Sequence, residues 1–458
     1  MRLRLFVAAT AVALVTPALS GLAPVSALPV APGSFMSPNV EWLGAIPDAA
    51  GISAKFITNR KGIAEWMYMS TTKGLTIYDV SNPALPLLTG VLPLPHFENE
   101  DIDGNANIAI ISTSPGGQIF IIDTFVKSRP ILKHVLQADD GDAHVSACVD
   151  DCERYLYSTE GSALKVVDLL AKPEPKITYV DWVKSIGPVH EVDQDDQGIV
   201  WMTGSNGGGG FAVHPLKTGS AKIKAKTSKA SPKNPVLITD MVVNGHNVGN
   251  DPEVNDFIQH NSKRPTKATY KQTKGKPRIA RGGVLAVTEE DYVPNCEGQG
   301  QFHTFQASGS VETGTPLRLL DTWKMREGTM SPQSGDRAEG TVFCSAHWFT
   351  VRDNIVAIGW YGGGTRLLDI SNPRDIRQVG YFVSADQETW AAYWVPGPSG
   401  VVYSVDVERG LDILQVDLKR TGATVMAPAP VRTKVSFLQP RKGSPYAYAC
   451  PTLAPLSR

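Results

Sequence analysis

The stretch Gly74-Leu-Thr-Ile-Tyr-Asp-Val-Ser-Asn-Pro83 returns 290 positions later as Gly364-Thr-Arg-Leu-Leu-Asp-Ile-Ser-Asn-Pro373. Shorter copies of its apolar core lie between and after these two, at Ile119–Asp123, Leu164–Asp168, Leu317–Asp321 and Leu411–Leu414. The aligned aspartates are spaced by 44 and 45 residues (Asp79, Asp123, Asp168) and by 48 residues (Asp321, Asp369). Self-similarity at a nearly fixed period is the mark of a repeat protein, and it decides the architecture before any single motif does.

Each copy of the repeat predicts a β-strand that ends in a tight turn. Leu75, Ile77 and Val80 are apolar and partly β-branched, as strands prefer. The following Ser-Asn-Pro stops the strand, because proline cannot donate to a sheet and asparagine bonds to local backbone groups. Further short apolar runs flank each copy. Three to four short strands per repeat are typical of a propeller blade, whereas helical repeats of similar length need a 3.6-residue apolar period that is absent here.

The repeat count predicts an all-β fold, a seven-bladed β-propeller with an enlarged fifth blade. Most units open with a histidine, and the last opens with a tryptophan: His96, His144, His190, His246, His347 and Trp390. The segment Val40–Ile46 has the pattern of a fourth strand, which the last unit lacks. We expect this N-terminal strand to complete the last blade and close the ring, because closure removes two open sheet edges.

The chain begins like an exported protein. Basic residues, an apolar run over Leu5–Val15 and the small-residue pattern Val25-Ser-Ala27 predict a signal peptide over residues 1–27. The propeller is then expected over residues 38–420, with an insertion at about 217–281, and a proline-rich tail over 421–458. No other stretch reaches the roughly 20 apolar residues of a membrane span. We expect a secreted, extracellular monomer without a transmembrane segment.

Five cysteines in an exported chain favour disulfides. Cys148 and Cys152 flank three residues, a spacing that suits a hairpin, and Cys296 with Cys344 is a second candidate pair. Cys450 is then left over in the tail. Connectivity does not follow from sequence, so free buried thiols remain the alternative for both pairs.

The repeated phrase resembles the unit of the LVIVD-repeat proteins, which are exported bacterial β-propellers. Four further phrases resemble a secreted subgroup typical of actinobacteria: Phe257–Pro265, Val287–Tyr292, Cys344–Phe349 and Glu388–Trp394. The resemblance implies the propeller fold and an extracellular location. It implies no biochemical activity, so function has to be argued from the residues.

The unit-opening histidines are the main functional clue. The first strand of each blade lines the central channel, so equivalent positions converge at one mouth. The candidate ligand-binding residues are His96, His144, His190, His246, His260, His347, Glu289, Glu290 and Trp390. Clustered imidazoles suit copper or zinc, and nearby carboxylates orient or complete such a site, which makes His96, His144, His190, His260 and His347 the candidate metal ligands.

Two other interpretations of these histidines stay open: hydrogen bonds between neighbouring blades, and an organic ligand at the channel mouth. Copper-dependent propellers such as methanethiol oxidase and nitrous oxide reductase share only the general plan with this chain. No Gly-x-Ser-x-Gly elbow and no HExxH zinc helix occurs. We therefore expect a binding or scaffold role rather than an enzyme, with a metal-dependent enzyme or metal-binding protein as the alternative.

Positive charge is concentrated in one region. Residues 217–281 carry fourteen lysines and arginines against four acids, whereas the whole chain has a net charge of −1. Such a segment fits an anionic extracellular or cell-wall partner, or it is simply a solvated insertion. Nucleic acid is not expected, because only Tyr270 interrupts the basic run between Lys263 and Arg281 and no aromatic platform for bases is present. Its segment Asn247–Lys276 directly follows His246 and is expected to form a partial lid that brings His260 over the mouth.

Overall fold

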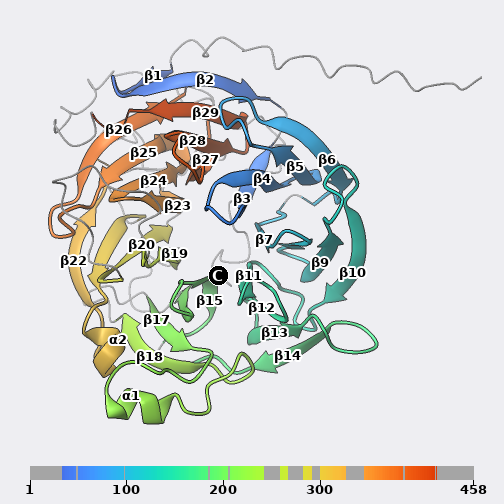
Figure 1. The fold of residues 1–458 in the computed structure, drawn as a ribbon, viewed down its shortest axis with the longest axis vertical. Helices are drawn as coiled ribbons and strands as arrows, with labels where there is room; N and C mark the ends of the chain where they lie inside the picture. Colours follow the sequence, from blue (N-terminus) through green and yellow to red (C-terminus); the bar gives the residue numbers. More distant parts are fainter. Residues whose placement is uncertain are drawn as a thin grey trace, which may run out of the picture.

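The computed structural model describes residues 34–47, 50–96, 98–183, 186–204, 207–241, 258–266, 282–290, 300–325, 345–384, 387–417 and 419. Strands dominate these residues and form sheets that stand in a ring around a common axis (Figure 1). The helical elements are short: α1 (Ala221–Lys226), α2 (Ser310–Thr313) and the 3-10 turn η1 (Tyr361–Gly363). The fold is therefore an all-β propeller, as the repeat predicts.

Five of the sheets are blades of four antiparallel strands each. The first two contain β3 (Gly51–Thr58), β4 (Ala64–Thr71), β5 (Gly74–Asp79) and β6 (Leu87–Pro93), and then β7 (Asp101–Gly104), β8 (Ile108–Ser112), β9 (Gln118–Asp123) and β10 (Ile131–Gln137). The third contains β11 (Ser146–Val149), β12 (Tyr155–Ser158), β13 (Leu164–Asp168) and β14 (Lys176–Val180). The fourth contains β15 (Val189–Gln194), β16 (Ile199–Gly204), β17 (Gly207–Ala212) and β18 (Val236–Met241). The fifth contains β19 (Ile258–Lys263), β20 (Val284–Glu290), β21 (Phe302–Gln306) and β22 (Arg318–Trp323).

The other described strands form one nine-stranded sheet, so the prediction of seven separate blades is wrong. The strands, in spatial order, are β1 (Phe35–Met36), β26 (Arg377–Val383), β25 (Gly364–Asp369), β24 (Ile355–Trp360), β23 (Ala346–Arg352), β27 (Thr389–Trp394), β28 (Val401–Asp406), β29 (Gly410–Val416) and β2 (Val40–Ile46). Its two antiparallel runs are joined by a short parallel pairing of β23 with β27, which matches Trp348 to Ala391 and Phe349 to Ala392.

Small side chains explain why these two runs merge. Gly359 of β24 backs onto β27 so closely that an added Cβ would lie 2.6 Å from the Ala391 nitrogen and 2.6 Å from the Trp390 carbonyl carbon. Ala391 and Ala392 also present only methyl groups at the junction. The inner ends of the two runs therefore approach to hydrogen-bonding distance. The repeat pattern does not reveal this, because it records strand order and not the spacing between neighbouring sheets.

The N-terminal strand pairs with the last strand, as the orphan segment suggests. β2 lies antiparallel to β29, with Val40 opposite Val416 and Ile46 opposite Leu411. The Trp42 indole nitrogen donates to Asp412 Oδ1 at 2.7 Å and strengthens the pairing. In Figure 1, β2 lies on the rim outside β29.

The repeated phrase occupies the third strand of its run in both full copies, β5 and β25. The aspartate that ends each strand caps the following turn: Asp79 Oδ1 accepts from the Ser81 amide at 2.9 Å, and Asp369 Oδ1 accepts from the Ser371 amide at 2.8 Å. The shorter copy at Leu317–Asp321 does not occupy the third strand of its blade. Arg318–Trp323 is the outer strand β22, and β21 is the third strand of that blade.

The apolar core lies between neighbouring sheets and not in the centre of the ring. One cluster, for example, joins Tyr157 and Val166 of the third blade to Val200 and Phe211 of the fourth. The strands nearest the centre are β3, β7, β11, β15, β19, β23 and β27 (Figure 1).

The disulfide between Cys148 and Cys152 is confirmed. Cys296, Cys344 and Cys450 lie outside the described residues, as do the predicted signal peptide, His246, residues 242–257 and 267–281 of the basic insertion, and the tail. No described helix is long and apolar enough to cross a bilayer.

Candidate metal centre

Four of the predicted histidines lie on neighbouring inner strands. His144 lies two residues before β11, and His190, His260 and His347 belong to β15, β19 and β23. All four side chains are at most 1% exposed. A buried imidazole loses its hydration, so each of these rings needs a partner within the protein or a bound ligand.

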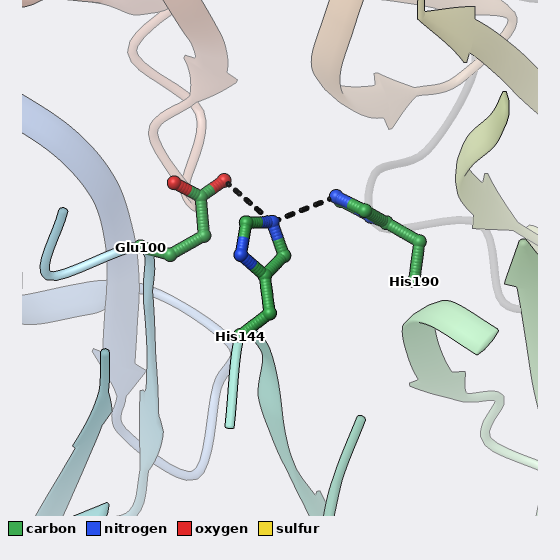
Figure 2. A group of neighbouring side chains, drawn as sticks. All are labelled: Glu100, His144 and His190. Carbon is green, nitrogen blue, oxygen red and sulfur yellow. Dashed lines mark hydrogen bonds and ion pairs between the residues drawn. The ribbon is translucent and has the colours of Figure 1, made fainter. Parts of the chain in front are cut away.

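The four rings form a continuous row. The Nε2 atoms of His144 and His190 are 2.9 Å apart (Figure 2). The ring centroids of His190 and His260 are 4.3 Å apart, and those of His260 and His347 are 3.9 Å apart. The prediction that imidazoles from different repeats converge is confirmed for these four side chains.

The Glu100 carboxylate lies among these rings. It directly precedes β7, is fully buried, and its Oε1 is 3.7 Å from His144 Nε2 (Figure 2). Two groups of potential ligands contain Glu100, one with His144 and His190 and one with His260 and His347; in each, the ligand atoms lie within 4.8 Å of one another. One carboxylate is thus close to all four imidazoles.

A second carboxylate, Glu290 at the end of β20, also lies against the row. Its Oε2 is 3.8 Å from His260 Nε2 and its Oε1 is 3.6 Å from His347 Nε2. The Tyr361 hydroxyl donates to Glu290 Oε1 and fixes the carboxylate. His347 Nδ1 donates to the Trp390 carbonyl oxygen at 2.8 Å. Because a carbonyl only accepts, Nδ1 carries the proton and the lone pair lies on Nε2, the nitrogen that faces Glu290.

Burial keeps the histidines neutral and disfavours a charged Glu100. Loss of hydration lowers the pKa of His190 to about 3, and burial together with neighbouring imidazoles lowers the pKa of His144 and His260. Burial, and then Glu98 and Glu290, raise the pKa of the Glu100 carboxyl well above its ordinary value. Neutral imidazole is the form that binds metal ions, and a cation near Glu100 would reverse the cost of its charge.

Several of these atoms have no hydrogen-bond partner among the described residues. They include both carboxylate oxygens of Glu100, both ring nitrogens of His260 and Nε2 of His347. Native proteins rarely leave such atoms unsatisfied, and a bound ion or water is a common reason where they do. Imidazole nitrogens and carboxylate oxygens, without a thiolate, form a donor set suited to zinc or copper.

Three residues further along the same inner strands lies a layer of ion pairs. Asp193 binds Lys263, and Asp103 binds Lys55 Nζ at 2.5 Å. These carboxylates are paired with lysines, whereas no lysine or arginine of the described residues forms an ion pair with Glu100. The candidate metal centre is therefore restricted to the histidine row with Glu100 and Glu290.

The other predicted site residues lie apart from the row or at its edge. His96 is half-buried and its Nε2 lies 2.9 Å from the Pro115 carbonyl oxygen. Glu289 contacts His303, with Oε1 2.5 Å from Nε2, and does not face the row. Trp390 flanks it, with its ring 5.2 Å from His347. His260 belongs to an inner strand and not to a covering loop, so the prediction that it lies on a lid is wrong. Ile258–Lys263 consists mostly of polar residues, so its sequence lacks the apolar pattern of a strand.

Glu100 was missed as a central residue, although the repeat contains a signal for it. Counting back from the third-strand aspartates, His144 precedes Asp168 by 24 residues and His347 precedes Asp369 by 22. Glu100 precedes Asp123 by 23 residues, whereas His96 precedes it by 27. The residue equivalent to the histidines in that repeat is therefore Glu100, and a search restricted to histidine passes over it.

Fold and site together define an all-β propeller with a buried histidine–carboxylate centre. No family model matches the chain, and no curated protein matches it. Among solved structures, it is similar to the β-propeller domain of Cps50 (Swd1) from Myceliophteria thermophila, with a TM-score of 0.52 and 11% identity over 82% of this chain and 100% of that domain. A chain of a mitotic checkpoint complex gives a TM-score of 0.49 at 8% identity, over 90% of this chain and 99% of that one. The first likeness supports the propeller fold alone.

Proposed function

We propose that this protein is a transition-metal-binding propeller, with the ion held by the row of His144, His190, His260 and His347. The observation that carries the proposal is the position of Glu100, buried and within 4.8 Å of ligand atoms of all four imidazoles. A metal cation would compensate the charge of this carboxylate and use the lone pairs of the neutral rings.

The hydrogen-bonding interpretation of the histidines accounts for less of the geometry. A ring that only links neighbouring strands has a backbone or side-chain partner on at least one nitrogen. His144 and His190 do, because their Nε2 atoms lie within hydrogen-bonding distance of each other. His260 has no hydrogen-bond partner on either nitrogen among the described residues, although the ring is fully buried and its Nε2 lies 3.8 Å from Glu290 Oε2. The His347 tautomer, fixed by the Trp390 carbonyl, also follows the usual arrangement of a metal-binding histidine, with one nitrogen bonded to the protein and the other directed into the site.

The predicted signal peptide supports a role at the cell exterior, where copper and zinc are both plausible ions. A binding or scaffold role is the second candidate, and exposed apolar side chains favour it. Leu87 and Val91 of β6 are 61% and 50% exposed, and Ile131 and Val135 of β10 are 42% and 48% exposed. Both strands lie on the rim of the ring (Figure 1), so these apolar side chains are accessible to a partner.

Elemental analysis tests the metal proposal. The protein is purified without a polyhistidine tag, stripped with a chelator, reloaded with zinc or copper and desalted before its metal content is measured. At least one tightly held ion per chain is expected. Loss of a residue that only orients a metal ligand weakens metal binding about 10–100-fold. His260→Ala removes a ligand itself and should weaken binding by more.

His303→Gln is the matched control, because His303 is 1% exposed and belongs to no candidate ligand group among the described residues. It should retain the wild-type metal content and affinity. A wild-type protein that retains no zinc or copper after reloading, or a His260→Ala variant that binds as tightly as wild type, overturns the proposal.

A further inference from the structure

We propose that the centre holds two metal ions, bridged by the carboxylate of Glu100. His144 and His190 bind the first ion, and His260, His347 and Glu290 bind the second. This inference rests on the proposed metal-binding function. It adds the number of ions and states which residues bind each ion.

The spacing of the ligand atoms argues against a single ion. Two nitrogens on opposite sides of one zinc ion, each about 2.0–2.1 Å from it, are at most about 4.2 Å apart. All ligands of one ion must therefore fall within that distance of one another. Among the described residues, the groups whose ligand atoms lie within 4.8 Å contain three residues each, and none contains all four histidines. In this arrangement one ion does not reach the whole row.

Two of the three groups divide between two ions: one contains Glu100 with His144 and His190, the other Glu100 with His260 and His347, and Glu100 is the residue they share. The third group contains His190, His260 and Glu290, so it joins residues of both halves. Both oxygens of Glu100 are buried and have no hydrogen-bond partner among the described residues. A carboxylate with two available oxygens between two pairs of imidazoles is suited to bridge ions about 3.5–4 Å apart, the usual separation in two-metal sites.

Glu290 makes the two halves unequal. Its two oxygens lie 3.8 Å from His260 Nε2 and 3.6 Å from His347 Nε2, so we assign it to the second ion; His190, which shares a ligand group with it, is assigned to the first. With the bridge counted on both sides, the protein supplies three ligands to the first ion and four to the second. The first ion therefore keeps a position for water or a small oxygen-donor ligand, because tetrahedral zinc takes four ligands.

Titration of the chelated protein with zinc, followed by elemental analysis, measures the number of ions. Two ions per chain are expected for the wild type. Glu100→Gln should lower the count to one or weaken the second ion at least tenfold, because the bridge is lost. Glu388→Gln is the matched control: Glu388 is also buried, at 4% exposure, but belongs to none of the ligand groups among the described residues.

Copper provides a second readout that does not depend on how well Glu100→Gln folds. Two copper(II) ions joined by a carboxylate couple magnetically, so the integrated electron paramagnetic resonance signal of the wild type should fall well below its copper content. In His144→Ala, which keeps only the second site, signal and copper content should agree at one ion per chain.

The possible outcomes separate the two proposals. A count of zero ions overturns the metal-binding function itself. A count of one in the wild type, with an uncoupled copper signal, leaves that function standing and overturns the two-ion inference. A count of two that Glu100→Gln leaves unchanged, with unchanged affinity, overturns the bridging role.

Discussion

The junction between β23 and β27 allows a test that links the fold to the site. Gly359→Ala adds one methyl group where three backbone atoms of β27 would lie 2.6–2.7 Å away. Ordinary contacts between carbon atoms are about 3.5–4.0 Å, so β27 would have to retreat by about 1 Å. Backbone atoms do not rotate away as a flexible side chain does. We therefore expect the usual cost of overpacking, about 1–3 kcal/mol of unfolding free energy.

The same displacement should reach the metal centre. The Trp390 carbonyl adjoins the clash and accepts the His347 Nδ1 proton at 2.8 Å. A shift of about 1 Å takes this hydrogen bond beyond its ordinary range of about 2.7–3.2 Å. His347 then loses the partner that sets its tautomer, and metal affinity should fall by about 10–100-fold.

Urea unfolding of the chelated protein measures the first effect, and zinc titration against a competing chelator measures the second. Ile358→Val is the matched control on the same strand: its side chain packs in the neighbouring core cluster, and loss of one methyl costs about 0.5–1.5 kcal/mol. This variant should be destabilised but retain wild-type affinity. If the unfolding free energy of Gly359→Ala lies within about 0.5 kcal/mol of the wild-type value, the close approach at the junction is refuted.

Three further predictions concern the stability of the propeller. Trp42→Phe removes the hydrogen bond to Asp412 and should lower the unfolding free energy by about 1 kcal/mol in urea, since β2 is held to β29 by this contact; an unchanged midpoint would contradict it. Cys148→Ser opens a disulfide between residues four positions apart and should cost about 2 kcal/mol under oxidising conditions but nothing after reduction of both proteins. Burial raises the pKa of the Glu388 carboxyl from 4.5 to about 8, so the folded protein holds a proton that the unfolded chain releases, and stability should fall as pH rises through that window. Glu388→Gln should remove this loss of stability when urea unfolding midpoints are compared between pH 4.5 and about 8. An equal pH dependence in both proteins would refute the role of the Glu388 carboxyl.

The sequence by itself determined the repeat, the class of the fold and most of the imidazoles. Gly74–Asp79 and Gly364–Asp369 form strands that end at the aspartate, because apolar alternation and turn chemistry are local properties. The pairing of Val40–Ile46 with the last strand also followed, since an orphan strand and an open edge complement each other. His144, His190 and His347 were brought together by their equivalent repeat positions.

Only the tertiary structure decided how neighbouring sheets meet and which carboxylate joins the histidines. The parallel pairing of β23 with β27 depends on the close approach that Gly359 permits, which is a contact between repeats and leaves no periodic trace. Glu100 and Glu289 are both acids near predicted ligands in the sequence, yet Glu100 lies among the imidazoles whereas Glu289 contacts His303. Neighbouring residues on a strand point to opposite faces of the sheet. A difference of one position along the strand therefore decides whether a side chain points into the metal centre or into the space between neighbouring sheets.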